Sequence, residues 1–539
     1  MRTINLTAPA GSATALIVQA LLSAQNGDVI RLNGGVWHFY EDGACERYAA
    51  PSNNANGIKR IIFPLIDRRN VAVDGGGAVL MFHDRVFPFL ISGCEDVRIE
   101  NLTIDFSFPR YAVATALESD ERGFSLRVDE ARYPWFAENG GWAFRAGSAV
   151  RSTAEKKFFL SGGMKDRACC YLAAGDTRDP LFNLAAPLVR ADAHRAAPDV
   201  VRLDYREDSA HIVLESGAQM IVSNDENREN DVFFIENSAG VTVRAITILR
   251  GAGMGFIGQM SRDILLEDIA VHSLPERGEP YSITADIFHF VNCSGALVIR
   301  RCTASDSLDD AVNVHGIYTR VQSAGEDKLM LQLGHQEQYG LNPYRAGDRV
   351  RVTRGDETGV RGWLTVAECV LGSDEKTLAM AYKDADGLIE PGDYIDNPDR
   401  APELLIEDCR FERCPRVLLG SSRRTIVRRN HFALNGAVAI IDGMAYWYEA
   451  GLVEDVRIED NFFDRSGLKD AAAVTVILRA GAETQRAHRN IRISGNRVTG
   501  TPAFIDAAHA DGLTIEGNLF EDSAGEIRLR GCRNVRIDG

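Results

Sequence analysis

The sequence predicts an all-β chain that folds as a right-handed parallel β-helix with an N-terminal cap and two inserted β-barrel-like modules. Three observations lead to this prediction. A short strand–turn–strand phrase recurs along most of the chain, its interval matches one coil of a β-helix, and its apolar residues alternate with polar ones.

The recurring phrase is a short alternating strand, an acidic or Asn/Gly turn and a second strand. It is seen in Asp96-Val-Arg-Ile-Glu-Asn-Leu-Thr-Ile, Asp263-Ile-Leu-Leu-Glu-Asp-Ile-Ala-Val and Asp455-Val-Arg-Ile-Glu-Asp-Asn-Phe-Phe. The interval is about 22 to 24 residues where no insertion intervenes, as from Val241 to Ile264. Apolar residues at period two point inward, and Asn, Gly or Asp takes the left-handed conformation at the corners.

The rhythm divides the chain into five parts. Turn-plus-strand phrases such as Ala346-Gly-Asp-Arg-Val-Arg-Val are typical of small barrels rather than of coils. At the N-terminus, the mostly apolar run Ala13 to Leu22 predicts a cap helix that covers open strand edges. We therefore expect a cap with the first coils (1–110), a β-rich insertion (111–223), coils that carry an Asp cluster (224–316), a small inserted barrel (317–399) and C-terminal coils (400–539).

Composition and charge narrow the function classes. Among 539 residues, 45% are apolar and 25% charged, as in soluble globular proteins. The net charge of -16 disfavours nucleic acid and anionic membranes as partners and favours a neutral substrate. The ten cysteines show no metal-type spacing and are expected to be reduced thiols. Without a recognisable signal peptide, we expect a cytoplasmic protein.

Three carboxylates are expected to converge on one face. Asp286 precedes Asp309 and Asp310 by 23 and 24 residues, which is one coil. Like charges held together raise the pKa of one member, which keeps a carboxylic acid protonated near neutral pH. A single Asp at a β-helix corner is more often structural, but three aligned on adjacent coils favour general acid–base chemistry.

These residues resemble a known family. An Asp followed one coil later by Asp-Asp is similar to the polygalacturonase-like β-helix glycosidases. A closer resemblance is to glycoside hydrolase family 110, the α-1,3-galactosidases, in Asp309-Asp-Ala-Val-Asn-Val-His-Gly, in Ile61-Ile-Phe-Pro-Leu-Ile followed by Asn70-Val-Ala-Val-Asp-Gly-Gly-Gly, and in Asn101-Leu-Thr-Ile-Asp-Phe. The resemblance runs from about residue 25 to near the C-terminus.

The resemblance implies an exo-acting, inverting α-galactosidase with a carbohydrate substrate. We expect that it needs neither an organic cofactor nor a metal, because acid and base carboxylates suffice for glycoside hydrolysis and the sequence shows no His/Cys ligand set. By analogy, Asp309 is the general acid, while Asp286 and Asp310 hold the attacking water. Neighbouring strand residues face opposite sides, so this assignment requires a bend or bulge at Asp309-Asp310.

Three further residues are candidates for substrate binding. His315 could hydrogen-bond an acid or a sugar hydroxyl. Arg416, aligned one coil beyond the second insertion, could bind sugar hydroxyls or offset the charge of Asp310. Trp447, in Tyr446-Trp-Tyr, could stack on the apolar face of a pyranose or anchor a loop. For His289, we expect an inward polar stack with Asn313 on the next coil.

Two other functions stay open. One is a polysaccharide lyase in which clustered Asp residues bind Ca²⁺, although lyases need a Lys, Arg or Tyr base and an acidic substrate. The other is a non-enzymatic glycan-binding β-helix in which the carboxylates only ligate metal or bind sugar.

Overall fold

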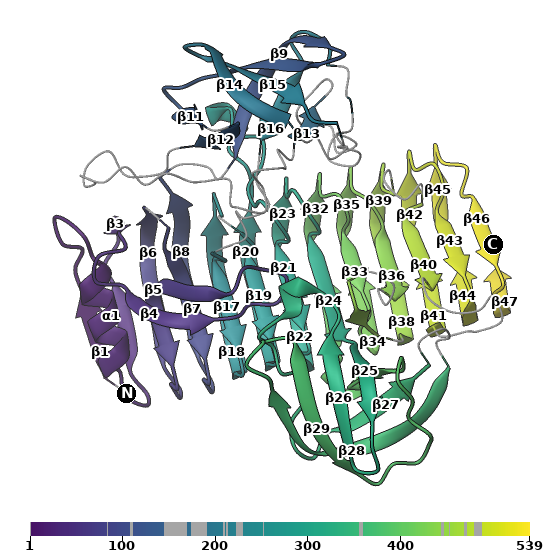
Figure 1. Cartoon of the computed structure of the whole chain (residues 1–539). Helices are drawn as coiled ribbons and strands as arrows, with labels where there is room; N and C mark the ends of the chain where they lie inside the picture. Colours follow the sequence, from purple (N-terminus) through teal and green to yellow (C-terminus); the bar gives the residue numbers. More distant parts are fainter. Residues whose placement is uncertain are drawn as a thin grey trace.

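The structure is a computed structural model that describes residues 2–83, 85–107, 111–138, 140–144, 170–173, 191–207, 211, 214–222, 230–251, 253–354, 359–442, 447–451, 453–467, 472–478 and 488–538. Parallel strands stack into a long right-handed coil that runs from the N-terminus to the C-terminus, with a β-sheet module on one side and a barrel on the other (Figure 1). The predicted fold class is therefore confirmed.

A typical coil has three strands, and equivalent strands of successive coils pair in parallel. The first face carries the functional residues discussed below. Its strands, in spatial order, are β4 (Cys45–Ala49), β5 (Gly57–Ile66), β7 (Phe87–Ser92), β17 (Phe233–Glu236), β19 (Phe256–Gln259), β21 (Phe288–Val291), β24 (Val312–Ile317), β33 (Leu418–Gly420), β36 (Val438–Asp442), β40 (Val474–Leu478), β43 (Ile505–Ala508) and β46 (Ile527–Arg530), with β37 (Glu449–Ala450) paired antiparallel to β24.

The other two faces belong to one large sheet. The second face comprises β1 (Thr3–Leu6), β2 (Val29–Leu32), β6 (Ala72–Phe82), β8 (Arg98–Phe106), β18 (Ala239–Ile248), β20 (Arg262–Val271), β22 (Ser294–Arg300), β31 (Glu403–Glu407), β34 (Arg424–Arg428), β38 (Glu454–Glu459), β41 (His488–Ser494), β44 (Ala510–Glu516) and β47 (Arg533–Asp538). The third comprises β3 (Val36–Phe39), β23 (Thr303–Ser305), β32 (Arg410–Glu412), β35 (His431–Ala433), β39 (Phe462–Asp464), β42 (Arg497–Thr499) and β45 (Leu519–Glu521).

The register and the corners follow the sequence pattern. Val241 pairs with Ile264 across β18 and β20, as the repeat interval predicts. Asn70, Asp96 and Asp263 have φ of 51°, 55° and 57°, a left-handed conformation that Asn and Asp tolerate better than most residues. The corner residues of the repeat therefore turn the chain as expected.

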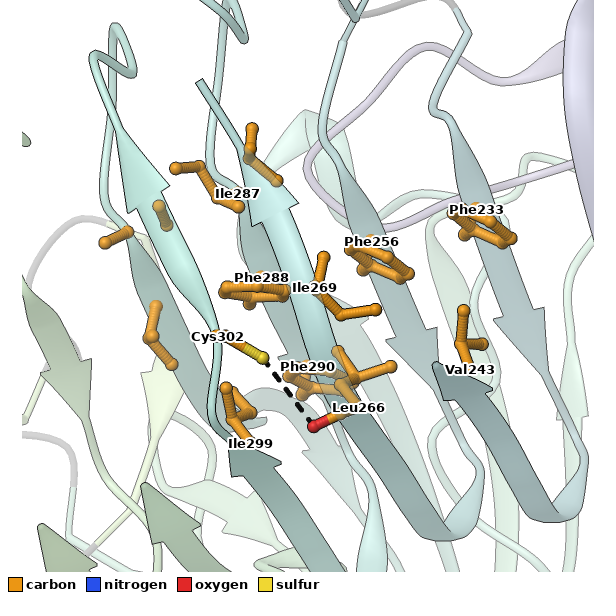
Figure 2. Packing of buried hydrophobic residues seen from close by; sticks show 14 of the residues in the cluster. Phe233, Val243, Phe256, Leu266, Ile269, Ile287, Phe288, Phe290, Ile299 and Cys302 are labelled. Atoms are coloured by element: carbon orange, nitrogen blue, oxygen red, sulfur yellow. Dashed lines mark hydrogen bonds between the residues drawn. The ribbon is translucent and has the colours of Figure 1, made fainter. Parts of the chain in front are cut away.

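Stacked side chains fill the coil. Phe89, Phe233, Phe256 and Phe288 form a ladder along the first face, with neighbouring ring centroids 4.4, 4.6 and 5.4 Å apart. Figure 2 shows the last three of these rings. All four rings are fully buried, and the last of them, Phe288, follows Asp286 of the cluster by two residues. Offset stacking of this kind adds about 0.5–1.5 kcal/mol per pair to the burial of the rings.

A second ladder of amide side chains runs through the C-terminal coils. The backbone N–H of Asn430 donates to Oδ1 of Asn461, and the backbone N–H of Asn461 donates to Oδ1 of Asn496. These buried amides satisfy backbone groups at one corner of the coil. The eight cysteines whose side chains are described are all free, and five of them are buried.

The N-terminal end is covered by helix α1 (Thr14–Ser23), which buries Ile17 and Leu21. Short 3₁₀ turns occur at η3 (Pro275–Arg277), η4 (Gln336–Gln338) and η5 (Pro398–Arg400). No helix within the described ranges is long and apolar enough to cross a membrane.

The first inserted module is a six-stranded antiparallel sheet, ordered β13 (Cys170–Ala173), β16 (Gln219–Val222), β9 (Ala112–Asp120), β10 (Gly123–Val128), β15 (Val200–Tyr205) and β14 (Ala191–Ala197), with a separate hairpin of β11 (Trp135–Glu138) and β12 (Gly141–Phe144). Buried Arg250 of the coil joins this module to the β-helix. It donates to Asp105 and Glu279, and Glu279 also accepts from Arg132 of the module.

The second inserted module is a closed barrel with its own apolar interior. It leaves the coil after β24 and returns at β31. Its strands are β25 (Thr319–Ala324), β26 (Lys328–Leu333), β29 (Thr377–Lys383), β28 (Val360–Leu371), β27 (Arg349–Thr353) and β30 (Tyr394–Asp396).

Candidate active site

Two neighbouring strands of the first face position the acidic cluster. β21 and β24 pair in parallel with Phe288 opposite Val312. Asp286 and Asp310 each lie two residues before these partners, and the backbone N–H of Ile287 donates to the carbonyl of Asp310 over 3.0 Å. The one-coil spacing in the sequence thus becomes direct lateral stacking.

The chain bends at Leu308 and Asp309, just before β24 begins. The bend is held by side chains. The backbone N–H of Asp310 lies 3.1 Å from Oδ1 of Asp286 and 3.1 Å from Oδ1 of Asp309, and the hydroxyl of Ser307 donates to the carbonyl of Asp309. The assignment of catalytic roles to both Asp309 and Asp310 required a bend or bulge between strand residues that would otherwise face opposite sides. The bend at Leu308 and Asp309 meets that requirement.

The three carboxylates come together. One oxygen of each lies within 4.8 Å of the others, with Asp286 and Asp310 buried and Asp309 partly exposed. Asp309 is therefore the most accessible member of the cluster. Among the described residues, this is also the group of His, Cys, Asp and Glu side chains that could hold a metal ion.

Arg416 occupies the place equivalent to Asp310 on the next coil, because the backbone N–H of Ala311 donates to the Arg416 carbonyl. Its Nη1 donates to Oδ2 of Asp310 over 3.0 Å, and the two side chains are 16% and 4% exposed. A guanidinium at this distance favours the ionised carboxylate. The sequence left two roles open for Arg416, binding of sugar hydroxyls or compensation of the charge of Asp310, and the structure shows the contact with Asp310.

His289 is the partner of Asp286. Its Nδ1 lies 2.6 Å from Oδ2 of Asp286, and its side chain is fully buried. The expected inward stack of His289 with Asn313 is wrong. The two residues are in register, but Phe288 and Phe290 on either side belong to the coil interior, so alternation turns His289 to the outer face of the sheet.

His315 lies behind His289 rather than in contact with solvent. Its Nδ1 donates to the carbonyl of Gly316 over 2.7 Å, and its Nε2 lies 3.2 Å from Nε2 of His289. Burial lowers the pKa of His315, while Glu449, with Oε1 3.5 Å from Nε2, raises it. The net direction is downward, which favours the neutral imidazole.

Trp447 lies against the barrel. Its ring centroid is 4.4 Å from that of His335, and its carbonyl accepts a hydrogen bond from the Gln338 amide. The sequence left two roles open for Trp447, stacking on a sugar ring or anchoring a loop, and these contacts are those of a loop anchor. Tyr446 lies outside the described residues.

Sequence reasoning missed three residues near the cluster. Glu449 arrives on β37, whose antiparallel pairing with β24 leaves no local signal in the sequence. Asp306 accepts hydrogen bonds from Ser273 and from Arg413 of the next coil, and this braces the segment that leads to Asp309. The alignment of Arg413 with Asp306 across coils was the available signal for that pair.

The arrangement suits acid–base chemistry better than metal binding. Ca²⁺ takes about 6 to 8 oxygen ligands, whereas here Asp310 already contacts a guanidinium and Asp286 an imidazole. Two carboxylates with cationic or imidazole partners beside a third, more exposed one can hold a water and donate a proton.

Comparisons with known proteins agree with the motifs. The chain is 27% identical to "Alpha-1,3-galactosidase A" of Shewanella woodyi, covering 86% of this chain and 75% of that protein. It is 24% identical to "Alpha-1,3-galactosidase B" of Bacteroides thetaiotaomicron (95% and 85%) and 25% identical to "Alpha-1,3-galactosidase A" of Bacteroides fragilis (95% and 86%). No family model matches the chain.

Among solved structures, the chain is similar to the polygalacturonase of Erwinia carotovora ssp. carotovora, with 9% identity, coverage of 99% and 96%, and a TM-score of 0.46. It is also similar to an exopolygalacturonase of Thermotoga maritima, with 12% identity, coverage of 100% and 92%, and a TM-score of 0.36. The resemblance stated from the motifs is confirmed by the curated homologues, which support a glycoside hydrolase.

Proposed function

We propose that this glycoside hydrolase removes terminal α-1,3-linked galactose from a neutral oligosaccharide or glycan. The names of the relatives support the sugar and the linkage. The observation that carries the proposal is the acidic cluster itself, in which three carboxylates approach within 4.8 Å on adjacent coils.

In this proposal the three carboxylates have separate roles. Asp309 is the general acid that protonates the departing oxygen, because it is the most accessible of the three. Asp310 beside Arg416 and Asp286 beside His289 stay ionised and hold the attacking water. Neighbouring carboxyl groups can take acid and base roles when their different surroundings move their pKa values apart.

Inversion rests on the resemblance rather than on the spacing. Acid and base carboxylates are about 6.5 to 9.5 Å apart in most inverting enzymes and about 5 to 5.5 Å apart in retaining ones. The closest oxygens of this cluster are nearer than either range, so distance alone does not select the outcome. We propose inversion with exo action, which makes β-galactose the first product.

Proton NMR of the anomeric signals during hydrolysis tests the proposal in one experiment. The wild-type enzyme is incubated with an α-1,3-linked galactoside and with an aryl α-galactoside. We expect the β-anomer first, followed by mutarotation. Early α-anomer would refute inversion, an unsaturated product would identify a lyase, and binding without turnover of any α-galactoside would identify a glycan-binding protein.

A further inference from the structure

Behind the acidic cluster, a chain of buried groups runs from Asp286 through His289 and His315 to Glu449. His289 and His315 have side chains 0% and 1% exposed, and those of the two carboxylates are 5% and 6% exposed. The roles assigned above use His289 only as the neighbour of Asp286, and they do not use His315. Buried polar groups of this kind are costly unless their hydrogen bonds are complete.

The hydrogen bonds of this row of buried groups determine how many protons the two imidazoles hold. A carbonyl only accepts, so Nδ1 of His315 carries a hydrogen for Gly316. The contact between the two Nε2 atoms needs a second hydrogen, and the contact between Nδ1 of His289 and Oδ2 of Asp286 needs a third. Two neutral imidazoles supply only two hydrogens, so the three contacts together require one additional proton.

The additional proton belongs to the imidazoles. Imidazole is more basic than an Asp carboxyl by about 2.6 pKa units in water, and two carboxylates flank the pair of rings. We propose that His289 carries this additional proton as an imidazolium while His315 stays neutral, and that His289 is a positioning residue that holds Asp286 ionised and oriented toward the water. Burial lowers the pKa of His315, in line with its neutral state. The proposal rests on the proposed function for its catalytic consequence, but not for the protonation itself.

The same geometry explains how three carboxylates coexist. The guanidinium of Arg416 offsets Asp310, and the imidazolium of His289 offsets Asp286. Asp309 is the member to which the proposed function assigns the role of general acid. Each base carboxylate thus has its own cation, one from the neighbouring coil and one from its own strand.

Nitrogen NMR of the histidine side chains tests the protonation without any substrate. In ¹⁵N-labelled wild type near neutral pH, we expect resonances in which both ring nitrogens of His289 are protonated, whereas His315 is protonated at Nδ1 alone. The resonances of each residue disappear when it is replaced, in His289→Gln and in His315→Gln. The matched control is His488→Gln, another fully buried His, which donates to the carbonyl of Ile477 and whose pKa burial lowers to about 4. Two neutral imidazoles in the wild type would overturn the proposal.

Kinetics test the positioning role. In His289→Gln the amide still donates to Asp286 but carries no charge. On an aryl α-galactoside, which needs little help from the general acid, we expect kcat to fall about 100-fold with KM nearly unchanged. We also expect the alkaline limb of the wild-type kcat profile to be lost, because an amide does not titrate. The charged groups in contact with the pair are Asp286 beside His289 and Glu449 beside His315, and the carboxylates of Asp309 and Asp310 lie close to that of Asp286.

The outcomes separate the two proposals. Equal losses in His289→Gln and His488→Gln, with an unchanged pH profile, would mean that His289 only supports the fold. If the wild type hydrolyses no α-galactoside, the proposed function fails, while the nitrogen resonances still decide whether the pair is charged.

Discussion

Replacing Arg416 with Met removes the cation beside Asp310 while preserving side-chain length. At 3.0 Å and an effective dielectric constant of about 20, the attraction is about 5 kcal/mol before desolvation is counted. Breaking a buried pair typically costs about 3–5 kcal/mol, because one charge is left behind. At pH values below the shifted limb the variant avoids that cost by protonating Asp310, which then cannot act as a base.

The expected result is a shift of the acid limb of kcat/KM toward higher pH. The carboxylate is active when ionised, so its activity is present above the limb and lost below it. A guanidinium within about 4 to 6 Å lowers the pKa of a carboxyl group by about 1 to 3 units, so its removal raises that pKa. The limb should therefore rise by about that amount, while activity well above the limb returns toward the wild-type value.

The assay is the pH–rate profile on an aryl α-galactoside, with Arg416→Lys as the matched control. Lysine keeps the charge but loses the planar guanidinium, so its limb should move much less. An unmoved limb in Arg416→Met would refute the reasoning. A higher KM with an unchanged limb would mean that Arg416 binds sugar instead.

Four other outcomes are expected. Asp309→Asn should lose about 10² to 10⁴ in rate on natural galactosides but much less on aryl galactosides. Asp310→Asn should have a low rate on both substrates. Equal, modest losses in the two variants would contradict the assigned roles. Arg250→Met should destabilise the junction of the first module by about 3–5 kcal/mol, seen as faster proteolysis of that module than in wild type; an unchanged cleavage rate would argue against the contact. Phe256→Ala should cost about 3–5 kcal/mol in unfolding free energy, and a loss below 1 kcal/mol measured by denaturant titration would mean that the ring ladder contributes little. Activity should survive chelation; inactivation reversed by Ca²⁺ would identify a metal-dependent site.

The sequence predicted the coil because two simple signals coincide in it. Apolar alternation marks the inward face, and Asn, Asp or Gly marks each corner. The pairing of Val241 with Ile264 follows from the interval alone. The same arithmetic aligned Asp286 with Asp310 and, across the barrel, Arg416 with both, so the acidic cluster could be located without coordinates.

The surroundings of the cluster could not be predicted in the same way. Asp286 lies in a corner, where strand alternation does not apply, so its contact with His289 three residues later depends on a local bend. Glu449 reaches the site on a strand that runs against the coil direction, so no repeat interval applies to it. Patterns of period two or of one coil describe the scaffold, whereas these contacts depend on connections that leave it.

The barrel between β24 and β31 also separates two contacting residues of the site in time during synthesis. Asp310 and Arg416 are separated by 106 residues, although their side chains touch. At a synthesis rate of about 5 to 20 residues per second, Asp310 is made roughly 5 to 20 seconds before its guanidinium partner. The cation beside Asp310 therefore becomes available only after the whole barrel and the start of the next coil have been synthesised.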